Sequence, residues 1–478
     1  MPDPQPLSNR QRKILERQAE RNREMAAAKR ADTRTPFREA ELQFLSRQPQ
    51  PDFSLALDFR QPSEKLLQDP KIRKVQLKKR MGEFSELFGV KDREQDAGLE
   101  DKEAEEDGRE YAYFHSDHPG LIYIPFGFSP SAQRKLIRAC LKEYSRHPNK
   151  SNLDTHYNVP DCGVWDLHER VANGSLSLEN DKDEAFVPRK AKADEQANGY
   201  GSDDDDDDSD NGSGDQSTKN KDRPTEKEPR PTKKAKSATK TPSVRTLVPE
   251  TDQTPTVPED VPKTDPEPSS QVPILPPSQL IKKMRWITLG YQYHWPSKTY
   301  HFDQNAPFPK ELCVLSKAVV EAVESVAGPG SPWHYPAEEF VAEAGVVNYY
   351  QLKDRLMGHV DRSELNKDAP LVSFSFGHSC IYLLGGPTRE TAPTPVLLQS
   401  GDILVMTGPC RAAFHGVPRI IENTLPSYLQ AQSDDPEWDI YAEYLSEARI
   451  NLNIRQVYPP KKNESTSSSS STLASLSS

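Results

Sequence analysis

The sequence is poor in cysteine and has no long apolar run. Its five cysteines, at positions 140, 162, 313, 380 and 410, are scattered, and no two of them have the Cys-x-x-Cys spacing. This argues against a cysteine-based zinc module or a disulfide framework and favours a reducing compartment. Because no run of 18 apolar residues occurs, we expect no transmembrane helix and no membrane partner. The N-terminus carries acids, unlike a transit peptide, so we expect the nucleus or cytoplasm and leave mitochondria open.

Apolar residues are also scarce, at 34%, whereas the chain has 43 prolines and 28% charged residues. This composition is typical of a folded core joined to segments that cannot bury enough apolar surface to fold. Six consecutive aspartates, residues 203–208, contribute much of the net charge of −11. Residues 281–460 contain 15 Lys and Arg against 20 Asp and Glu, a balance of −5. A nucleic-acid partner would therefore need a local basic patch.

The composition divides the chain into six expected segments. They are a charged helical or disordered tail (1–35), N-terminal arms and a connector (36–110), an N-terminal part of the core domain (111–174), a disordered acidic and Pro-rich insertion (175–280), the core (281–460) and a disordered Ser-rich tail (461–478). The cluster "RPTKKAK" in the insertion is either a nuclear localisation signal or a solvated basic patch. Apolar spacing predicts helices from about Ser131, capped by Ser129 or Ser131, and over 310–327.

Short β-prone segments separated by Gly, Pro and Asp fill the core and predict a sandwich or barrel. One of its turns reads "GHVDRSE" and contains His359 and Asp361. On extended chain, residues two apart point to the same side, so both side chains can reach one ion. A second histidine, His415, follows a later strand. Two histidines and a carboxylate are the ligand set of non-haem iron(II) oxygenases, although an isolated His-x-Asp pair is also common in solvated turns.

The last strand, "RINLNIR", places four polar side chains on one face: Arg449, Asn451, Asn453 and Arg455. Burying two arginines is costly without an anionic partner, and the planar guanidinium pairs well with a carboxylate such as that of 2-oxoglutarate. The alternative is the solvent-facing side of an edge strand. The segment "VVNYYQL" adds Asn348 and Tyr350 on one face of another strand.

The motifs "NYY", "HVD", "FHGVPR" and "RINLNIR", in this order, resemble the AlkB family of iron(II)- and 2-oxoglutarate-dependent dioxygenases. "RWITLGYQYHW", "PLVSFSFG" and "IYLLGG" add similarity to its eukaryotic AlkB-homologue-one branch. The resemblance covers 281–458 and, more loosely, 117–172. It implies a mainly β fold with flanking helices, built on a double-stranded β-helix or jelly-roll core.

The resemblance also implies a role for individual residues. Iron(II) would be bound at the catalytic centre by His359, Asp361 and His415. The cosubstrate 2-oxoglutarate, which is consumed with molecular oxygen, would be held by Asn348, Tyr350, Arg449, Asn451, Asn453 and Arg455. Arg449 would face its distal carboxylate and Arg455 its chelating end. An aromatic lid for the substrate base would contain Trp286 and Tyr291, whose alternative role is wall packing.

Two positions depart from the family pattern. The family usually has Thr where Asn453 stands, and the bacterial type member has an acid where Ser363 stands, near the substrate base. The implied function is oxidative demethylation of modified nucleic acid, either tRNA or DNA. The alternatives are the same chemistry on a methylated protein such as a histone, and a non-catalytic jelly-roll binding module. A nucleic-acid enzyme would cluster basic residues near Trp286, with candidates at Lys282, Lys283, Arg285 and Lys298.

Overall fold

The structure, a computed structural model, describes residues 34–77, 111–191 and 265–460, apart from 329, 332, 433 and 434. Several predicted segments therefore lie outside the described residues. They are the N-terminal tail to residue 33, the connector from 78 to 110, the aspartate run, the "RPTKKAK" cluster and the Ser-rich tail from 461.

The strands form two antiparallel sheets. In the larger sheet the order is β1 (Ile72–Gln76), β2 (Tyr111–His115), β3 (Leu121–Ile124), β12 (Ile403–Met406), β9 (Leu371–Gly377), β14 (Ala448–Arg455), β7 (Ala344–Gln351), β5 (Trp286–His294) and β4 (Lys150–Ser151), with β6 (Thr299–Asn305) paired to β5. In the smaller sheet the order is β11 (Thr394–Leu398), β10 (Cys380–Leu384), β13 (His415–Ile420) and β8 (Leu356–His359). This confirms the predicted double-stranded β-helix.

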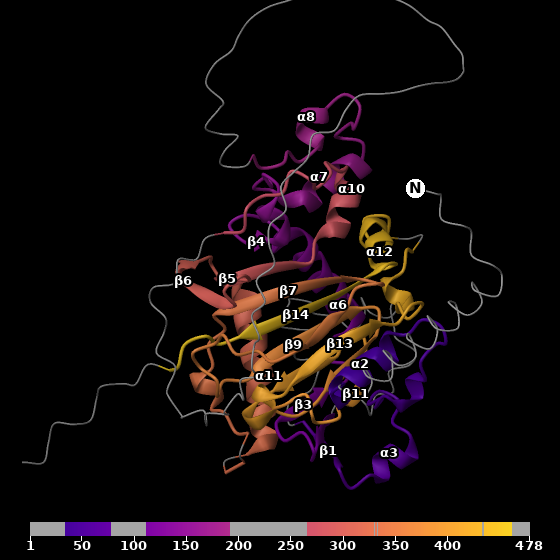
Figure 1. The fold of residues 1–478 in the computed structure, drawn as a ribbon, viewed down its shortest axis with the longest axis vertical. Coiled ribbons are helices and arrows are strands. Elements are labelled where there is room, and N and C mark those ends of the chain that lie inside the picture. The colour runs from indigo at the N-terminus through magenta and orange to yellow at the C-terminus, as the bar shows by residue number, and fades with distance from the viewer. Residues whose placement is uncertain are drawn as a thin grey trace, which may run out of the picture. The chain divides into compact units, whose positions relative to one another are not determined.

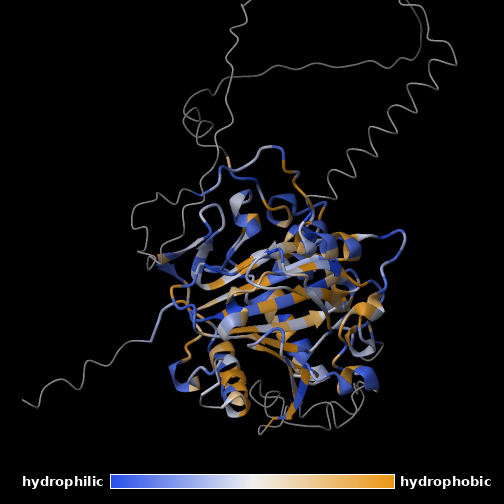
Figure 2. Ribbon diagram, turned by 60° about the horizontal axis from the view of Figure 1, so that its bottom comes forward, coloured by the Kyte–Doolittle hydropathy of each residue, from blue (hydrophilic) through white to orange (hydrophobic). Residues whose placement is uncertain are grey.

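The two faces of the larger sheet differ in character. Its outer face carries Val372, Phe374, Ile450 and Leu452, which join the main hydrophobic cluster under the helices. Its inner face meets the smaller sheet in a second cluster that contains Leu404, Met406 and Tyr350 from one sheet and Tyr382 and Val417 from the other. Polar residues alternate with these apolar ones, and Figure 2 shows both kinds interleaved along the central strands. The polar inner face lies where ligands of a jelly roll can be enclosed.

Most helices cover the outer face and the ends of the larger sheet, whereas the first packs on the smaller sheet through Phe37 and Phe44, which contact Ile381 and Leu383 (Figure 1). The helices are α2 (Pro36–Leu45), α3 (Glu64–Gln68), α6 (Pro130–Arg138), α7 (Gly163–Ala172), α8 (Lys182–Ala185), α10 (Pro277–Leu280), α11 (Lys310–Ala327) and α12 (Asp439–Leu445). Two of them match the predicted helices: α6 begins after Ser129, whose hydroxyl accepts from the Ala132 N–H, and α11 spans 310–327. None of the helices in the described ranges is long and apolar enough to cross a membrane.

The predicted disordered insertion was too broad at both ends. Residues 175–191 and 265–280, assigned to it from their composition, include α8 and α10. Three scattered apolar side chains, Leu176, Val187 and Leu280, are buried in the main cluster. The Tyr157 hydroxyl also donates to the Pro273 carbonyl at 2.6 Å. A few anchors thus fix segments whose average composition is polar, because burial depends on individual positions and not on the mean.

Candidate metal centre and cosubstrate site

The three predicted metal ligands come together although two of them lie more than 50 residues from the third. His359, the last residue of β8, stands opposite His415, the first residue of β13, in the antiparallel pairing. Their ring centroids are 4.4 Å apart. Asp361 follows two residues after β8, with Oδ1 3.7 Å from His359 Nε2 and Oδ2 3.9 Å from His415 Nε2. Pairing of the two strands therefore converts a sequence motif into a convergent set of donors.

Hydrogen bonds fix the orientation of both imidazoles. His359 Nδ1 lies 2.9 Å from the Met357 carbonyl, and His415 Nδ1 lies 3.2 Å from the Ala413 carbonyl. A carbonyl only accepts, so each Nδ1 carries a proton, and in the neutral form of such a ring Nε2 keeps the lone pair that binds a metal. This arrangement is common among metal-binding histidines. Burial, reinforced by the neighbouring His359, lowers the pKa of His415 to about 4, which keeps its ring neutral at physiological pH.

A buried ion network surrounds Asp361. Arg455 Nη2 donates to Asp361 Oδ2 at 2.9 Å, while Arg455 Nε lies 3.3 Å from Glu364 Oε1. Arg411 Nη2 and the Tyr300 hydroxyl both reach Glu364, at 3.3 and 3.2 Å. Burial opposes ionisation of Asp361, but the positive charge of Arg455 outweighs it and lowers the pKa of this carboxyl. Asp361 is therefore ionised, and with the imidazoles of His359 and His415 it provides the 2-His-1-carboxylate donor set suited to iron(II).

The strand that carries "RINLNIR" is central, and this rejects the alternative of a solvent-exposed edge. Strand β14 lies between β7 and β9, and Arg449, which stands opposite Tyr350, is only 1% exposed. Arg449 Nη1 donates to the His378 carbonyl and Nη2 to Ser375 Oγ, both at 2.7 Å. Its Nε is buried and has no hydrogen-bond partner among the described residues.

These residues fit 2-oxoglutarate. A guanidinium has five donor hydrogens, and protein oxygens accept from only two nitrogens of Arg449. The buried Nε and the nearby Tyr350 hydroxyl are thus suited to a carboxylate, which would compensate the buried charge. Arg455 lies instead beside the metal ligand Asp361. The two arginines of β14 therefore have different surroundings, with Arg455 against Asp361 and Arg449 against Ser375 and the His378 carbonyl.

The three asparagines share this inner face. Asn451 Nδ2 donates to Ser373 Oγ at 2.8 Å and to the Phe374 carbonyl at 3.0 Å, and Asn348 lies opposite it, with a 3.5 Å contact between their amides. Asn453 stands opposite Val346, and its side chain makes no hydrogen bond within the described ranges. Asn451 is thus held by β9, while Asn453 is the least constrained of the three.

The two predicted lid aromatics have different surroundings. Trp286 opposes Asn348 in the sheet and packs on Trp295 with ring centroids 5.1 Å apart. Tyr291 instead packs on Tyr458, at 5.4 Å, and Phe302. Sequence reasoning missed Tyr293, whose hydroxyl lies 3.2 Å from Ser363 Oγ, and Trp295, which contacts it. Both occur in the same "YQYHW" segment, so the density of aromatic residues there was the available signal. We call Trp286, Tyr293 and Trp295 the aromatic cluster.

Sequence reasoning also missed Glu364 and Arg411 of the ion network around Asp361. Nothing in the sequence distinguishes them from other charged residues, which are ordinarily exposed.

Of the four predicted basic residues, Lys282 pairs with Glu447 at 2.8 Å and Arg285 lies 3.4 Å from Asp354. Lys283 and Lys298 are exposed. These four residues are therefore on the surface, as a nucleic-acid contact requires.

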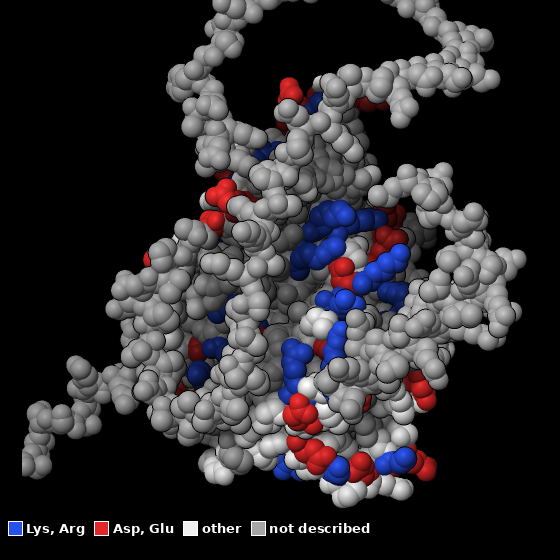
Figure 3. Space-filling model, viewed as in Figure 1, with Lys and Arg blue, Asp and Glu red and all other residues white. Residues whose placement is uncertain are grey.

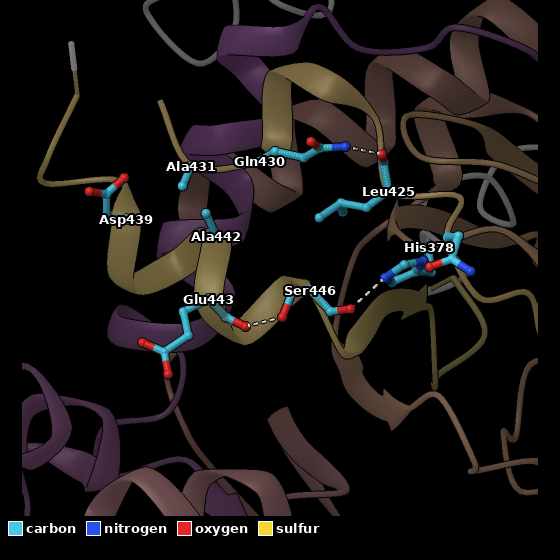
Figure 4. A pocket seen from close by; sticks show the side chains of 9 residues that line it. His378, Leu425, Gln430, Ala431, Asp439, Ala442, Glu443 and Ser446 are labelled. Atoms are coloured by element: carbon cyan, nitrogen blue, oxygen red, sulfur yellow. Dashed lines mark hydrogen bonds between the residues drawn. The ribbon is translucent and has the colours of Figure 1, made fainter. Parts of the chain in front are cut away.

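A separate pocket lies beside α12 and is lined by His378, Asp439, Glu443 and Ser446, among others (Figure 4). His378 Nε2 lies 3.0 Å from the Ser446 carbonyl, and Nδ1 accepts from the Thr424 N–H at 3.3 Å. Its own carbonyl accepts from Arg449. His378 is thus held from both sides and supports Arg449 through its backbone.

Comparison with known proteins identifies relatives. The profile of the 2OG-Fe(II) oxygenase superfamily matches residues 248–455. The nucleic acid dioxygenase ALKBH1 of Homo sapiens is 30% identical over 369 residues, which cover 74% of this chain and 68% of that protein. The tRNA demethylase abh1 of Schizosaccharomyces pombe is 40% identical over 182 residues, covering 38% of this chain and 55% of that protein. The DNA N(6)-methyladenine demethylase ALKBH1A of Arabidopsis thaliana is 38% identical over 187 residues, covering 38% and 51%. The chain thus spans about two thirds of the human relative and about half of the yeast and plant relatives.

Proposed function

The chain belongs to the 2OG-Fe(II) oxygenase superfamily, and on this premise we propose that it removes methyl groups from bases of tRNA or DNA by oxidation. Iron(II) with 2-oxoglutarate and oxygen supplies the hydroxylation of a carbon–hydrogen bond, and a hydroxymethyl group on nitrogen is lost as formaldehyde. The protein supplies position, charge and exclusion of water.

Each group of residues has a defined task in this reaction. His359, Asp361 and His415 would hold the metal on one side and leave its other positions to the cosubstrate and oxygen. Arg449 and Tyr350 would bind the distal carboxylate of 2-oxoglutarate. Arg455 keeps Asp361 ionised and adds positive charge beside the chelating end of the cosubstrate. The hydrogen bonds to Met357 and Ala413 hold the two imidazoles in the ligand tautomer.

The observation that carries the proposal is the register of β14. It places Arg449 opposite Tyr350 and Asn451 opposite Asn348, on the face whose last cation, Arg455, bonds the metal ligand Asp361. A sugar-binding or structural jelly roll has no use for a buried arginine and a second, largely buried one on the same strand face, beside a 2-His-1-carboxylate set. The geometry fits a metal with a dicarboxylate cosubstrate.

Nucleic acid is favoured as the substrate by the aromatic cluster and by surface charge. Trp286 and Trp295 pack against each other with their rings tilted by 37°, and Trp295 is 40% exposed, so a ring is available for a base extruded from the strand. Figure 3 shows Lys and Arg side chains gathered in the middle of one face with a few acidic side chains among them, whereas both signs alternate along its lower edge. Such a band can neutralise backbone phosphates despite the net negative charge.

The test measures succinate and formaldehyde after anaerobic loading with iron(II) and 2-oxoglutarate followed by oxygen. The substrates are tRNA containing N1-methyladenosine, DNA containing N6-methyladenine, and a methylated histone peptide. We expect both products with at least one nucleic acid, little with the peptide, and neither product from His359→Ala. Arg362→Ala is a matched control, because Arg362 is an exposed neighbour of Asp361.

Other outcomes would point elsewhere. Formaldehyde from the peptide alone would replace the nucleic-acid proposal with a protein demethylase. Succinate without formaldehyde from any substrate would indicate hydroxylation of a carbon-bound methyl group. Failure to bind either iron(II) or 2-oxoglutarate would reject the enzyme and leave the binding module.

A further inference from the structure

The described residues contain a second group of potential metal ligands, on the hairpin formed by β5 and β6. Ligand atoms of Asp265, His294 and His301 all lie within 4.8 Å of one another. We propose that these three residues bind a divalent transition-metal ion, with zinc as the ion best suited to them, at a site separate from the iron centre. The site does not depend on the proposed function.

The hairpin register brings the two histidines together. In the antiparallel pairing, His294 stands opposite Thr299 and His301 stands opposite Gln292. His294 and His301 are therefore diagonal neighbours on one face of the hairpin, and their ring centroids are 5.1 Å apart. Both are buried, at 6% and 8% exposure. Successive strand residues point to opposite sides, so His294 faces away from Tyr293, which reaches toward Ser363 in the "GHVDRSE" turn.

A hydrogen bond can orient His294 as a ligand, and a carboxylate lies near His301. His294 Nδ1 lies 2.6 Å from Ser297 Oγ, which in turn lies 2.7 Å from Thr299 Oγ1. His301 Nδ1 lies 3.7 Å from the Asp303 carboxylate. The Ser297 N–H also lies 3.3 Å from His294 Nδ1, so this ring can adopt either tautomer. A metal ion would select the tautomer in which Nδ1–H donates to Ser297 Oγ and Nε2 binds the ion, as metal-binding histidines generally do.

Asp265 completes the group from a distant part of the chain. It is the first residue of the described range 265–460, and it precedes the hairpin, which begins at Trp286, by about twenty residues. Ligands held about 2.0–2.2 Å from zinc lie roughly 3–4 Å apart, so small side-chain rotations would close the present spacing. The iron ligands show similar spacing, at 3.7 and 3.9 Å. Two imidazoles and one carboxylate leave a fourth position for water.

An ion at this site would connect the chain at Asp265 to the hairpin that carries the aromatic cluster. Trp295 directly follows His294 and packs on Trp286 and Tyr293, with ring centroids 5.1 and 4.8 Å apart. Because Trp295 is adjacent to a ligand, a paramagnetic ion bound there should quench its fluorescence. This gives a readout that does not require catalysis.

The test uses the full chain with His359→Ala and His415→Ala, which removes the iron centre as a competing site. After treatment with a chelator, the protein is titrated with Co2+ while visible absorption and tryptophan fluorescence are followed. We expect one Co2+ per chain, quenching, and displacement by Zn2+. Adding His294→Ala and His301→Ala should abolish binding, whereas His334→Ala, which removes a histidine beside Glu324, should not.

Asp265→Asn tests the third ligand without disturbing the buried hairpin, because Asp265 is exposed. We expect Co2+ affinity to fall at least about tenfold, while Asp368→Asn, another exposed acid, leaves it unchanged. A second variant carries His294→Ala and His301→Ala but keeps the iron ligands. Its circular dichroism and its iron(II) binding show whether the two histidine substitutions leave the fold intact. The proposal is overturned if the chain without iron ligands binds no Co2+, or if neither the histidine nor the Asp265 substitutions weaken binding.

Discussion

Glu41 accepts a hydrogen bond of 2.5 Å from the backbone N–H of Gly358, the residue directly before the metal ligand His359. Glu41 belongs to α2, is 2% exposed and also pairs with Arg38 at 2.8 Å. In the same helix, Phe37 packs so closely on Gly358 that an added Cβ would lie 2.4 Å from its ring. A helix more than 300 residues away in the sequence therefore supports the strand that carries a metal ligand.

We expect Glu41→Ala to weaken iron(II) binding about tenfold. The substitution removes the carboxylate that holds the Gly358 N–H and with it the strand of His359, and losing a group that positions a metal ligand typically costs at least this much affinity. The measurement is anaerobic iron(II) titration. Glu39→Ala, an exposed acid of the same helix, is the control and should bind iron normally. Equal iron affinity in the two variants would show that α2 does not position His359.

We expect Arg449→Lys to weaken 2-oxoglutarate binding by about a hundredfold or more while iron(II) binding is retained. Lysine keeps the charge but cannot reproduce the planar fork that bonds the His378 carbonyl, Ser375 and a carboxylate together. The measurement is 2-oxoglutarate titration of the anaerobic iron(II) protein. Arg419→Lys is the matched control, since Arg419 is equally buried but pairs with Glu422. Similar losses in both variants would indicate a general effect on folding.

We expect Trp295→Ala to raise KM for the nucleic-acid substrate and leave 2-oxoglutarate affinity unchanged. Stacking on an aromatic ring contributes roughly 1–3 kcal/mol per base, so the rise should be about 5- to 150-fold. Succinate release at varied substrate concentration measures it, with Val341→Ala as a control at another exposed apolar residue. An unchanged KM would remove Trp295 from the substrate site.

We expect stability to fall as pH is lowered from about 6.5 towards 4, with His118 as one cause. Burial, followed by the neighbouring His115, lowers the pKa of His118 from 6.5 to about 4. In that window the unfolded chain takes up a proton that the folded chain does not, so protonation favours unfolding. Neutral His118 is bonded to Thr394 Oγ1 at 2.7 Å.

The comparison is urea unfolding at pH 7 and pH 5. His118→Gln cannot be protonated, so it should lose less stability over this range than the wild type, by roughly 1 kcal/mol after allowance for solvent screening. His147→Gln, at a histidine whose side chain is 65% exposed, should keep the wild-type pH dependence. Identical pH dependence in all three proteins would contradict the assignment to His118.

The site was largely readable from the sequence because its chemistry depends on residue type and short spacing. "GHVDRSE" and "RINLNIR" place ligands at intervals of two, which extended chain projects to one side. The helices at Ser131 and 310–327 were readable for a similar reason, since helical periodicity and capping are local. The alternation in "RINLNIR" could not by itself distinguish a buried face from an exposed one. Only the position of β14 between β7 and β9 decided that.

The sequence could not predict contacts between residues that lie far apart along the chain. The contacts of Glu41 with the Gly358 N–H and of Glu364 with Arg411 involve charged side chains that, from the sequence, are expected at the surface. The same holds for the ordered ends of the predicted insertion, which depend on a few buried anchors. The sequence alone determined the ligand types, their local spacing and the family. The tertiary structure decided which charges are buried, what neutralises them and which aromatic rings meet, because these depend on strand pairing and packing between distant segments.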